Sequence, residues 1–282
     1  MIDRIIFIAD AFAADVPGGG ELNNDVLIQM FKAHGTPVNS IHSSGVIPPL
    51  IENHSECKFI VANFTGLNPL CRAALRGKKY IIYEHDHKYL KSRNPADFKD
   101  YVAPSSEIIN QEFYKEAAAV ICQSSFHANI VKKNLNLDNI VSVGGNLWSD
   151  DILAFLKEVS SRPKNDKCAV MVSNNWHKNT AGSIAYCEKH NLEFELVQTA
   201  PYKEFLSKLG ENKKLVFFPQ TPETLSRIVV EARMMGMSVI TNNQVGATQE
   251  EWFKYKGVAL VNVMKNKKIE IFNLVKGLLD GK

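Results

Sequence analysis

The chain has 282 residues, of which 45% are hydrophobic and 22% are charged, and its formal net charge at pH 7 is +3. This is the composition of an ordinary soluble globular protein, and the length suits two domains of about 140 residues. No run approaches about 18 apolar residues, so an integral membrane segment is not expected. Five cysteines without C-x-x-C spacing argue against zinc and disulfides and predict a cytoplasmic location.

Short apolar segments alternate with amphipathic ones, as in parallel sheets that helices cover on both faces. Charged residues flank the short apolar run of 4–9, which therefore reads as a first strand and not as a signal peptide. The first half predicts strands at 4–9, 38–42, 59–63, 79–84, 118–123 and 140–143, and helices at 21–33, 47–53, 69–76, 108–116, 125–135 and 148–159. A long polar loop is expected at 86–106.

A polar segment with a proline, 160–166, is the predicted domain boundary, which gives domains of residues 1–160 and 161–282. The pattern then restarts, with strands at 167–172, 194–197, 215–218, 238–241 and 258–261, and helices at 180–190, 202–209, 224–235, 249–255 and 269–279. Two consecutive α/β sheets predict a cleft between domains. Ligands of such sheets bind beyond the carboxyl ends of the strands.

The segment 222–243, PETLSRIVVEARMMGMSVITNN, holds two acids separated by seven residues. Glu223 precedes the predicted helix and Glu231 lies two turns into it, so helix geometry puts them on one side, about 12 Å apart along the axis. The N–H groups at the helix start favour an anion, and the segment therefore fits a nucleotide sugar. An amphipathic helix with two solvated acids is the alternative.

This segment resembles the E-x7-E segment of retaining glycosyltransferases of family 4, whose fold is called GT-B. Both acids, the apolar run, the following Gly236 and the Val-Ile pair agree. Leu225, Ser226 and Arg227 depart from the Phe, Gly and aliphatic residue that are usual there. The resemblance implies an α/β protein of GT-B fold, with two Rossmann-like doubly wound domains that face each other across a cleft.

The resemblance also implies roles for residues of the second domain. Glu223 is expected to be catalytic beside the transferred sugar, and Glu231 to bind the ribose hydroxyls. The segment Thr224, Leu225, Ser226 and Arg227 is expected to lie at the donor diphosphate.

Two further segments resemble family sites. Gly18, Gly19, Gly20 and Glu21 follow the first strand, and glycines let backbone N–H groups approach a phosphate; a simple turn is the alternative. After the first strand of the second domain, Lys178 matches the family's diphosphate-binding lysine and is expected to be catalytic, as a cation at the leaving group. Ser173 occupies the position of the family's arginine, and Arg227 is a candidate replacement.

The segment 83–87, YEHDH, ends a strand of the first domain. His85 is the closest match to the family's histidine that contacts the transferred sugar, and is expected to be catalytic. Alternating histidines and acids also suit a divalent metal. Enzymes of this fold generally need no catalytic metal, and alternate strand residues point to opposite faces, so no metal and no cofactor are expected.

Positive charge gathers between Lys58 and Lys99, with nine lysines and arginines against three acids. In the loop 86–104, basic residues alternate with aromatic ones that can stack on bases. The basic residues Lys88, Lys91, Arg93 and Lys99 are the predicted acceptor surface. A solvated connection is the alternative.

The sequence therefore predicts a metal-independent, retaining hexosyl or pentosyl glycosyltransferase that uses a nucleotide-diphosphate sugar, with UDP-sugar as the first candidate. The acceptor is an anionic molecule, with hydroxymethylated DNA as one candidate, as in phage enzymes that modify DNA, and cell-surface polysaccharide or lipid as others. A nucleotide-sugar epimerase and a non-catalytic nucleotide-sugar-binding protein are the rival functions.

Overall fold

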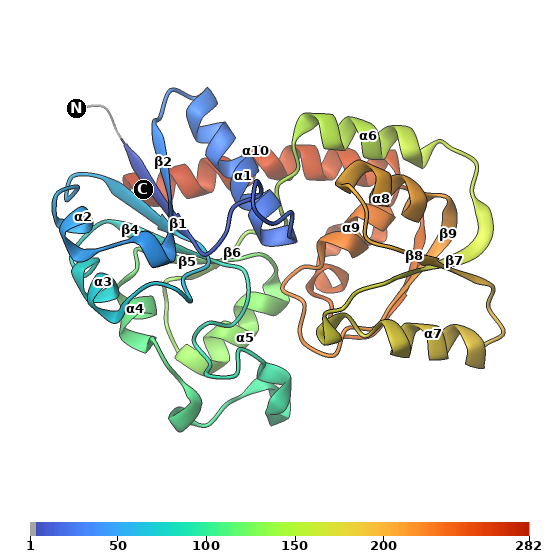
Figure 1. Cartoon of the computed structure of the whole chain (residues 1–282), viewed down its shortest axis with the longest axis horizontal. Coiled ribbons are helices and arrows are strands. Elements are labelled where there is room, and N and C mark those ends of the chain that lie inside the picture. The colour runs from blue at the N-terminus through green and yellow to red at the C-terminus, as the bar shows by residue number, and fades with distance from the viewer. Residues whose placement is uncertain (1–3, 282) are drawn as a thin grey trace. The chain divides into compact units, whose positions relative to one another are not determined.

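The computed structural model describes residues 4–281, which divide into two compact units (Figure 1). Among the described residues, unit 1 consists of 4–147 with 269–281, and unit 2 of Trp148–Lys268. Each unit contains one parallel sheet with helices on both faces, which confirms the predicted α/β class with two doubly wound sheets.

Unit 1 has six parallel strands in the order β2-β1-β3-β4-β5-β6. They are β1 (Ile5–Ala9), β2 (Val38–His42), β3 (Lys58–Val61), β4 (Tyr80–Glu84), β5 (Ala119–Cys122) and β6 (Ile140–Ser142). The chain passes from β1 to β2 on one side and then returns to β3 on the other side of β1. The loops after β1 and β3 therefore flank the reversal of strand order, which is where sheets of this kind bind ligands.

Alternate residues of β1 pack into two different cores, because successive side chains of a strand point to opposite faces. Ile6 and Ile8 face the core that contains four helices, and Ile5 and Phe7 face the core formed with the other two. The four helices are α2 (Pro48–Glu52), α3 (Pro69–Ala74), α4 (Gln111–Glu116) and α5 (Ser125–Leu135). The other two are α1 (Gly19–Ala33) and the end of α10 (Val258–Asp280).

Unit 2 has four parallel strands in the order β10-β9-β7-β8. They are β7 (Asn165–Met171), β8 (Phe194–Val197), β9 (Asn212–Phe217) and β10 (Ser238–Thr241). In Figure 1, α6 (Asp150–Ser160), α8 (Tyr202–Gly210) and α9 (Arg227–Met234) cover one face, and α7 (Thr180–Lys189) covers the other. The strand order reverses between β7 and β9, so the loops after these strands meet at the carboxyl edge.

The units differ from the expected division at residue 160. Trp148 and Leu156, from the segment of α6, are fully buried in the core of unit 2. Phe272 and Val275, at the other end of the chain, are buried in a core of unit 1. The apolar faces of these helices decide which sheet they cover. The polar segment 160–166 therefore does not mark the boundary between the units.

Three elements correct the sequence prediction. The expected strand at 258–261 is the first turn of α10, because Leu260 and Met264 bury at helical spacing. The helix expected from Thr224 begins at Arg227. The loop 86–106 contains short 3-10 turns and buries Tyr89 and Leu90 completely, so it is an ordered part of unit 1. Within residues 4–281, no helix is long and apolar enough to cross a bilayer.

Candidate functional site

Glu223 lies outside helix α9, which corrects the expected geometry of the two acids. Its N–H donates to the carbonyl of Gln244 at 2.8 Å, and its own carbonyl accepts from Gly246 at 3.0 Å. The N–H of Ala247 binds the carbonyl of Leu225 at 2.9 Å. The segment before α9 is therefore fixed by the segment that follows β10, and the helix-rise separation does not apply to Glu223.

Ser226 stands at the start of α9 with φ +72°, in the left-handed region that disfavours a side chain. Glycine, the family's residue at this position, adopts this conformation without strain. The Ser226 side chain is buried, and its hydroxyl has no hydrogen-bond partner among the described residues. The backbone therefore forms a left-handed turn just before α9 although the residue there is a serine.

Lys178 and Glu223, both predicted to be catalytic, lie together in unit 2. The Nζ of Lys178 is 2.7 Å from Oε1 of Glu223, and the two side chains are 31% and 14% exposed. The strand order explains the contact, because Lys178 follows β7 and Glu223 follows the neighbouring β9. Asn179 ties the two loops together by donating to the carbonyl of Phe218 at 2.9 Å.

Ser173 orders the loop that carries Lys178. Its N–H donates to the hydroxyl of Thr180 at 3.1 Å, and its own hydroxyl accepts from the N–H of Asn175 at 3.1 Å. A serine supplies no positive charge, so the phosphate-binding charge of the family's arginine is missing at this position.

Glu231 is 3% exposed and lies on the buried side of α9. Its Oε1 accepts from Nε1 of Trp148 at 2.9 Å and from the Tyr202 hydroxyl, and it is 3.0 Å from Nε of Arg227. Burial raises the pKa of Glu231, and Arg227 and the two hydrogen-bond donors lower it in part. The predicted contact of Glu231 with the ribose stays a prediction.

The glycine segment of unit 1 opens α1, with Gly18 as its N-cap residue and Gly19 and Gly20 in its first turn. A Cβ on Gly20 would lie 3.2 Å from Cγ of His85, so glycine permits the close approach of α1 to the end of β4. Glu21 accepts a hydrogen bond from the Asn63 amide at 3.2 Å. Loops that follow β1, β3 and β4 therefore meet at one edge of the sheet.

Both ring nitrogens of His85 are hydrogen-bonded within unit 1. Nε2 donates to Oδ1 of Asn24 at 2.7 Å, and Nδ1 accepts from the Gln123 amide at 2.5 Å. Burial lowers the pKa of His85 to about 3. His85 is therefore a neutral, oriented imidazole at physiological pH, and its predicted contact with the sugar stays a prediction.

Lys88 does not belong to a surface, which corrects the predicted acceptor patch. Its side chain is 2% exposed and forms ion pairs with Glu84 and, at 3.0 Å, with Asp86. Such burial requires paired charges, and the pairing fixes the chain just after β4. Lys91, Arg93 and Lys99 remain exposed.

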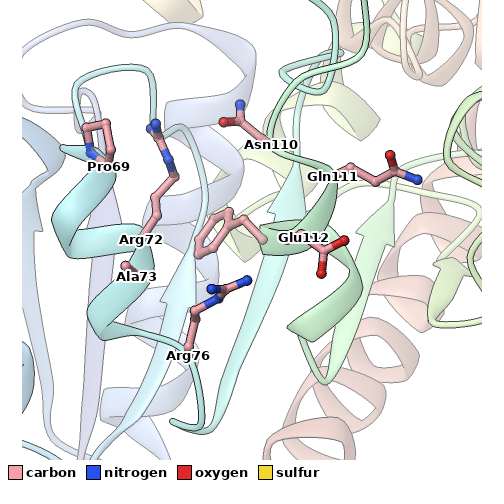
Figure 2. Close-up of a pocket in the computed structure, with 8 residues that line it drawn as sticks. Pro69, Arg72, Ala73, Arg76, Asn110, Gln111 and Glu112 are labelled. Carbon is pink, nitrogen blue, oxygen red and sulfur yellow. The ribbon is translucent and has the colours of Figure 1, made fainter. Parts of the chain in front are cut away.

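A pocket of about 380 Å³ opens between α3 and α4 in unit 1 (Figure 2). Arg72 and Arg76 line it on the α3 side, and Glu112 and Phe113 of α4 line it on the other. Arg76 is paired with Glu116 at 2.8 Å, so the charges at this end largely offset each other. None of the predicted site residues lines this pocket.

The part of the chain that the structure describes holds no group of three or more His, Cys, Asp or Glu side chains arranged to bind a metal ion. In the segment 83–87, His85 is engaged with amides, and His87 is buried beside Tyr89, with Nδ1 3.1 Å from the tyrosine oxygen. Asp86 binds Lys88 and Arg93. These side chains form a hydrogen-bonded and ion-paired network.

No model of a protein family matches the sequence, and no curated protein matches it. Solved structures do. Anabaena HepE in complex with UDP-glucose matches with a TM-score of 0.53 at 13% identity, over 98% of this chain and 92% of that chain. An alpha-glucosyltransferase in complex with UDP matches with a TM-score of 0.50 at 10% identity, over 99% and 93%. The same kind of enzyme with UDP and a 13-mer DNA matches with a TM-score of 0.50 at 9% identity, over 98% and 90%.

At such low identity the likeness shows the fold alone. Together with the two parallel sheets, it shows that the chain has the GT-B fold, as the resemblance in the sequence predicted.

Four residues of these arrangements were not singled out from the sequence. Trp148 and Tyr202 hold Glu231 in unit 2, and Asn24 and Gln123 hold His85 in unit 1. Trp148 and Gln123 lie in loops just before helices α6 and α5, and Tyr202 and Asn24 lie in the first two turns of helices α8 and α1. The sequence could have indicated these residues only as polar or amphipathic side chains near the starts of helices. Their partners are distant in sequence, so the contacts themselves could not be predicted.

Proposed function

We propose that the protein is a retaining glycosyltransferase whose donor is a nucleotide-diphosphate sugar bound in unit 2. The observation that carries the proposal is the contact of Lys178 with Glu223 beside the left-handed turn at Ser226. The positive end of the α9 dipole and the Lys178 ammonium suit a diphosphate, and the Glu223 carboxylate suits a sugar hydroxyl. These are the three groups that the donor's chemistry requires.

In the proposed reaction, the bond between the anomeric carbon and the phosphate oxygen breaks, and the acceptor oxygen bonds to the same face of that carbon. The proton of the acceptor hydroxyl passes to the departing phosphate oxygen, so no separate general base is needed. Lys178 stabilises the charge that develops on the diphosphate, and Glu223 orients the sugar. The reaction proposed here uses no metal and no cofactor.

UDP is the proposed nucleotide, because structures of the same fold are complexes with UDP or UDP-glucose. An anionic acceptor is proposed from the charge excess in 58–99, and one neighbour of the same fold is bound to DNA. DNA with a hydroxymethylated base is the first candidate, and cell-surface polysaccharide or lipid is the alternative. The proposed location is the cytoplasm, since all five cysteines are free and buried.

The test is to incubate the purified protein with UDP-sugars and candidate acceptors and to measure the release of UDP. Acceptor-dependent release of UDP, with an α-linked product from an α-linked donor by NMR, is the expected result. Interconversion of sugars without net release of UDP would establish an epimerase instead. Binding of UDP without hydrolysis or transfer of any donor would favour a non-catalytic binding protein. Glu223→Gln, which removes the charge at constant volume, is the matched inactive control.

A further inference from the structure

The second acid of the E-x7-E segment, Glu231, is buried inside unit 2, and one of its carboxylate oxygens is engaged. Its Oε1 lies within hydrogen-bond distance of groups from three elements: Trp148 just before α6, Tyr202 at the start of α8, and Arg227 at the start of α9. A ribose that bound this oxygen would have to displace at least one of these donors. The side chain of Glu231 is 4% exposed and that of Arg227 is 9% exposed, so of the two Arg227 offers a ligand the larger surface.

Glu231 forms an ion pair with Arg227, whose side chain is fixed by further contacts. Its guanidinium carbon lies 4.5 Å from the centre of the Trp148 ring and 5.9 Å from that of Tyr202. Its Nη2 donates to the Tyr202 oxygen at 3.2 Å, and its side chain is 9% exposed. An ion pair, a hydrogen bond and a stacked ring thus define one orientation for this long side chain, and such fixing lowers the entropy lost when the guanidinium binds a ligand.

Arg227 is also placed where a diphosphate is expected. It is the first residue of α9, and the positive end of the helix dipole attracts an anion there. Ser173 stands where the resemblance predicts an arginine, so a second cation at the diphosphate has to come from another residue. A planar guanidinium binds two phosphate oxygens at once, which an ammonium group does not.

We infer that Glu231 is a positioning residue that holds Arg227, and that Arg227, not Glu231, contacts the donor at its diphosphate. Trp148 and Tyr202 complete the support. The inference rests on the proposed function, because it concerns the binding of the same nucleotide. It departs from the ribose contact that the family resemblance implies for Glu231.

The two roles of Glu231 are separated by comparing uridine with UDP, which share the ribose and differ in the diphosphate. UDP affinity is measured by calorimetry and uridine affinity by ligand-observed NMR, for the parent and for Glu231→Gln. If Glu231 positions Arg227, UDP binding weakens about tenfold, as expected for a charge-assisted contact, and uridine binding changes less than about twofold. Equal weakening for both ligands would mean a ribose contact and would overturn the inference.

Tyr202→Phe is the second variant, because it removes the hydroxyl that touches both Glu231 and Arg227 and keeps the ring. It should weaken UDP binding in the same selective way, by a smaller factor, with an unchanged circular dichroism spectrum. Arg227→Gln should weaken UDP binding at least as much as Glu231→Gln and leave uridine binding unchanged. If Arg227→Gln binds UDP as the parent does, the inference is overturned while the proposed function stands. If the parent binds neither ligand, the proposed function itself fails, and the inference fails with it.

Discussion

At the scale of the residue, the two side chains proposed to be catalytic contribute little to the stability of the fold. The contact of Lys178 with Glu223 is partly exposed, and pairs of this kind contribute about 0–1 kcal/mol to folding. Ser226 is held in a backbone conformation that costs a residue with a side chain about 1–2 kcal/mol. Side chains that stabilise the fold little, at a strained turn, are expected where selection acts on binding and catalysis.

Lys178→Ala should lower turnover at saturating donor about 100-fold, the usual effect of removing one group that stabilises a developing negative charge. The melting temperature should change little, since the pair contributes little to folding. Lys203→Ala is the control, because Lys203 is another partly exposed lysine of unit 2, paired with Asp151 at 3.2 Å. Steady-state kinetics checks the prediction. Equal turnover in the two variants would remove Lys178 from the reaction.

Ser226→Gly should stabilise the protein by about 0.5–1 kcal/mol. The strain of the left-handed conformation is relieved, and part of that gain is offset by the flexibility of glycine in the unfolded chain. Ser226→Ala is the matched control: both variants remove the buried hydroxyl, but alanine keeps the strain, so Ser226→Gly should be the more stable of the two. Urea unfolding of both variants provides the measurement, and a destabilised Ser226→Gly would show that the hydroxyl has a partner in solution.

At the scale of the element, the segment after β4 is held by buried ionisable groups. Glu84, Lys88 and Asp86 form its ion pairs, and the neighbouring His87 and His127 are buried with their rings 5.1 Å apart. Burial lowers the pKa of both histidines, that of His87 to about 4. The order of this segment therefore depends on the charge states of these buried groups.

Acid should destabilise unit 1 through His87. The pKa of His87 is about 4 in the folded protein and about 6.5 in the unfolded chain. The unfolded chain therefore takes up a proton first, and the stability present above pH 6.5 is lost as the pH falls towards 4. Removing this group by His87→Gln should reduce the loss of unfolding free energy between pH 7 and 4.5 by about 2–3 kcal/mol. His34→Gln, which makes the same substitution at an exposed histidine after α1, is the matched control. Burial raises the pKa of Glu84, so its protonation in acid opposes the effect of His87 on stability. The quantity to compare is therefore the difference in unfolding free energy between each variant and the parent.

Helix α10 should contribute to the stability of unit 1 through its last turns. Phe272 is 3% exposed and packs on Phe31, with ring centres 5.0 Å apart. Phe272→Ala should lower the free energy of unfolding by about 3–5 kcal/mol, whereas Leu274→Ala, at a position 38% exposed on the same helix, should lower it far less. Denaturant unfolding followed by circular dichroism measures both. Similar effects for the two variants would mean that this part of α10 does not belong to the core of unit 1.

At the scale of the whole molecule, the net charge of +3 says little about partners, and the distribution of charge says more. Of the four basic residues that were predicted to form an acceptor surface, Lys88 is committed to the interior. Lys91, Arg93 and Lys99 are exposed, although Lys91 faces Glu107 at 3.7 Å and Arg93 holds Asp86 at 2.6 Å. Part of their charge is therefore already compensated, and only binding measurements decide what they recognise.

Binding of duplex DNA should fall with salt, with a log–log slope of about −0.9 for each phosphate contact. Replacing Lys91, Arg93 and Lys99 together by Glu should abolish most of the binding at low salt. The control replaces Lys203, Lys208 and Lys213 of unit 2 by Glu, which changes the net charge by the same amount at three similarly exposed lysines. A filter-binding or fluorescence-anisotropy series gives the slopes. Equal losses in the two triple variants would exclude a DNA site at this surface and favour polysaccharide or lipid acceptors.

The local pattern of the sequence determined the class of the fold. Helix 125–135 and strand 194–197 begin and end as predicted, because each combines a clear hydrophobic period with end signals close by, such as the N-cap Ser124. The local pattern gave a wrong prediction at 258–261, where a strand was expected and a helix is found. Four apolar residues there fit a strand as well as a helical turn, and only packing against the rest of unit 2 distinguishes them.

The resemblance and the alternation of elements also predicted that Lys178 and Glu223 lie near each other, and the structure brings the two side chains into contact. Only the tertiary structure decided what each side chain touches there. Glu231 meets Trp148, 83 residues away in the chain, and His85 meets Asn24 and Gln123. Lys88 is buried although its neighbours in sequence are polar. The burial and pairing of a side chain depend on residues that are distant in the chain. Periodicity and spacing carry information only about residues that are near in sequence, so they could not predict these contacts.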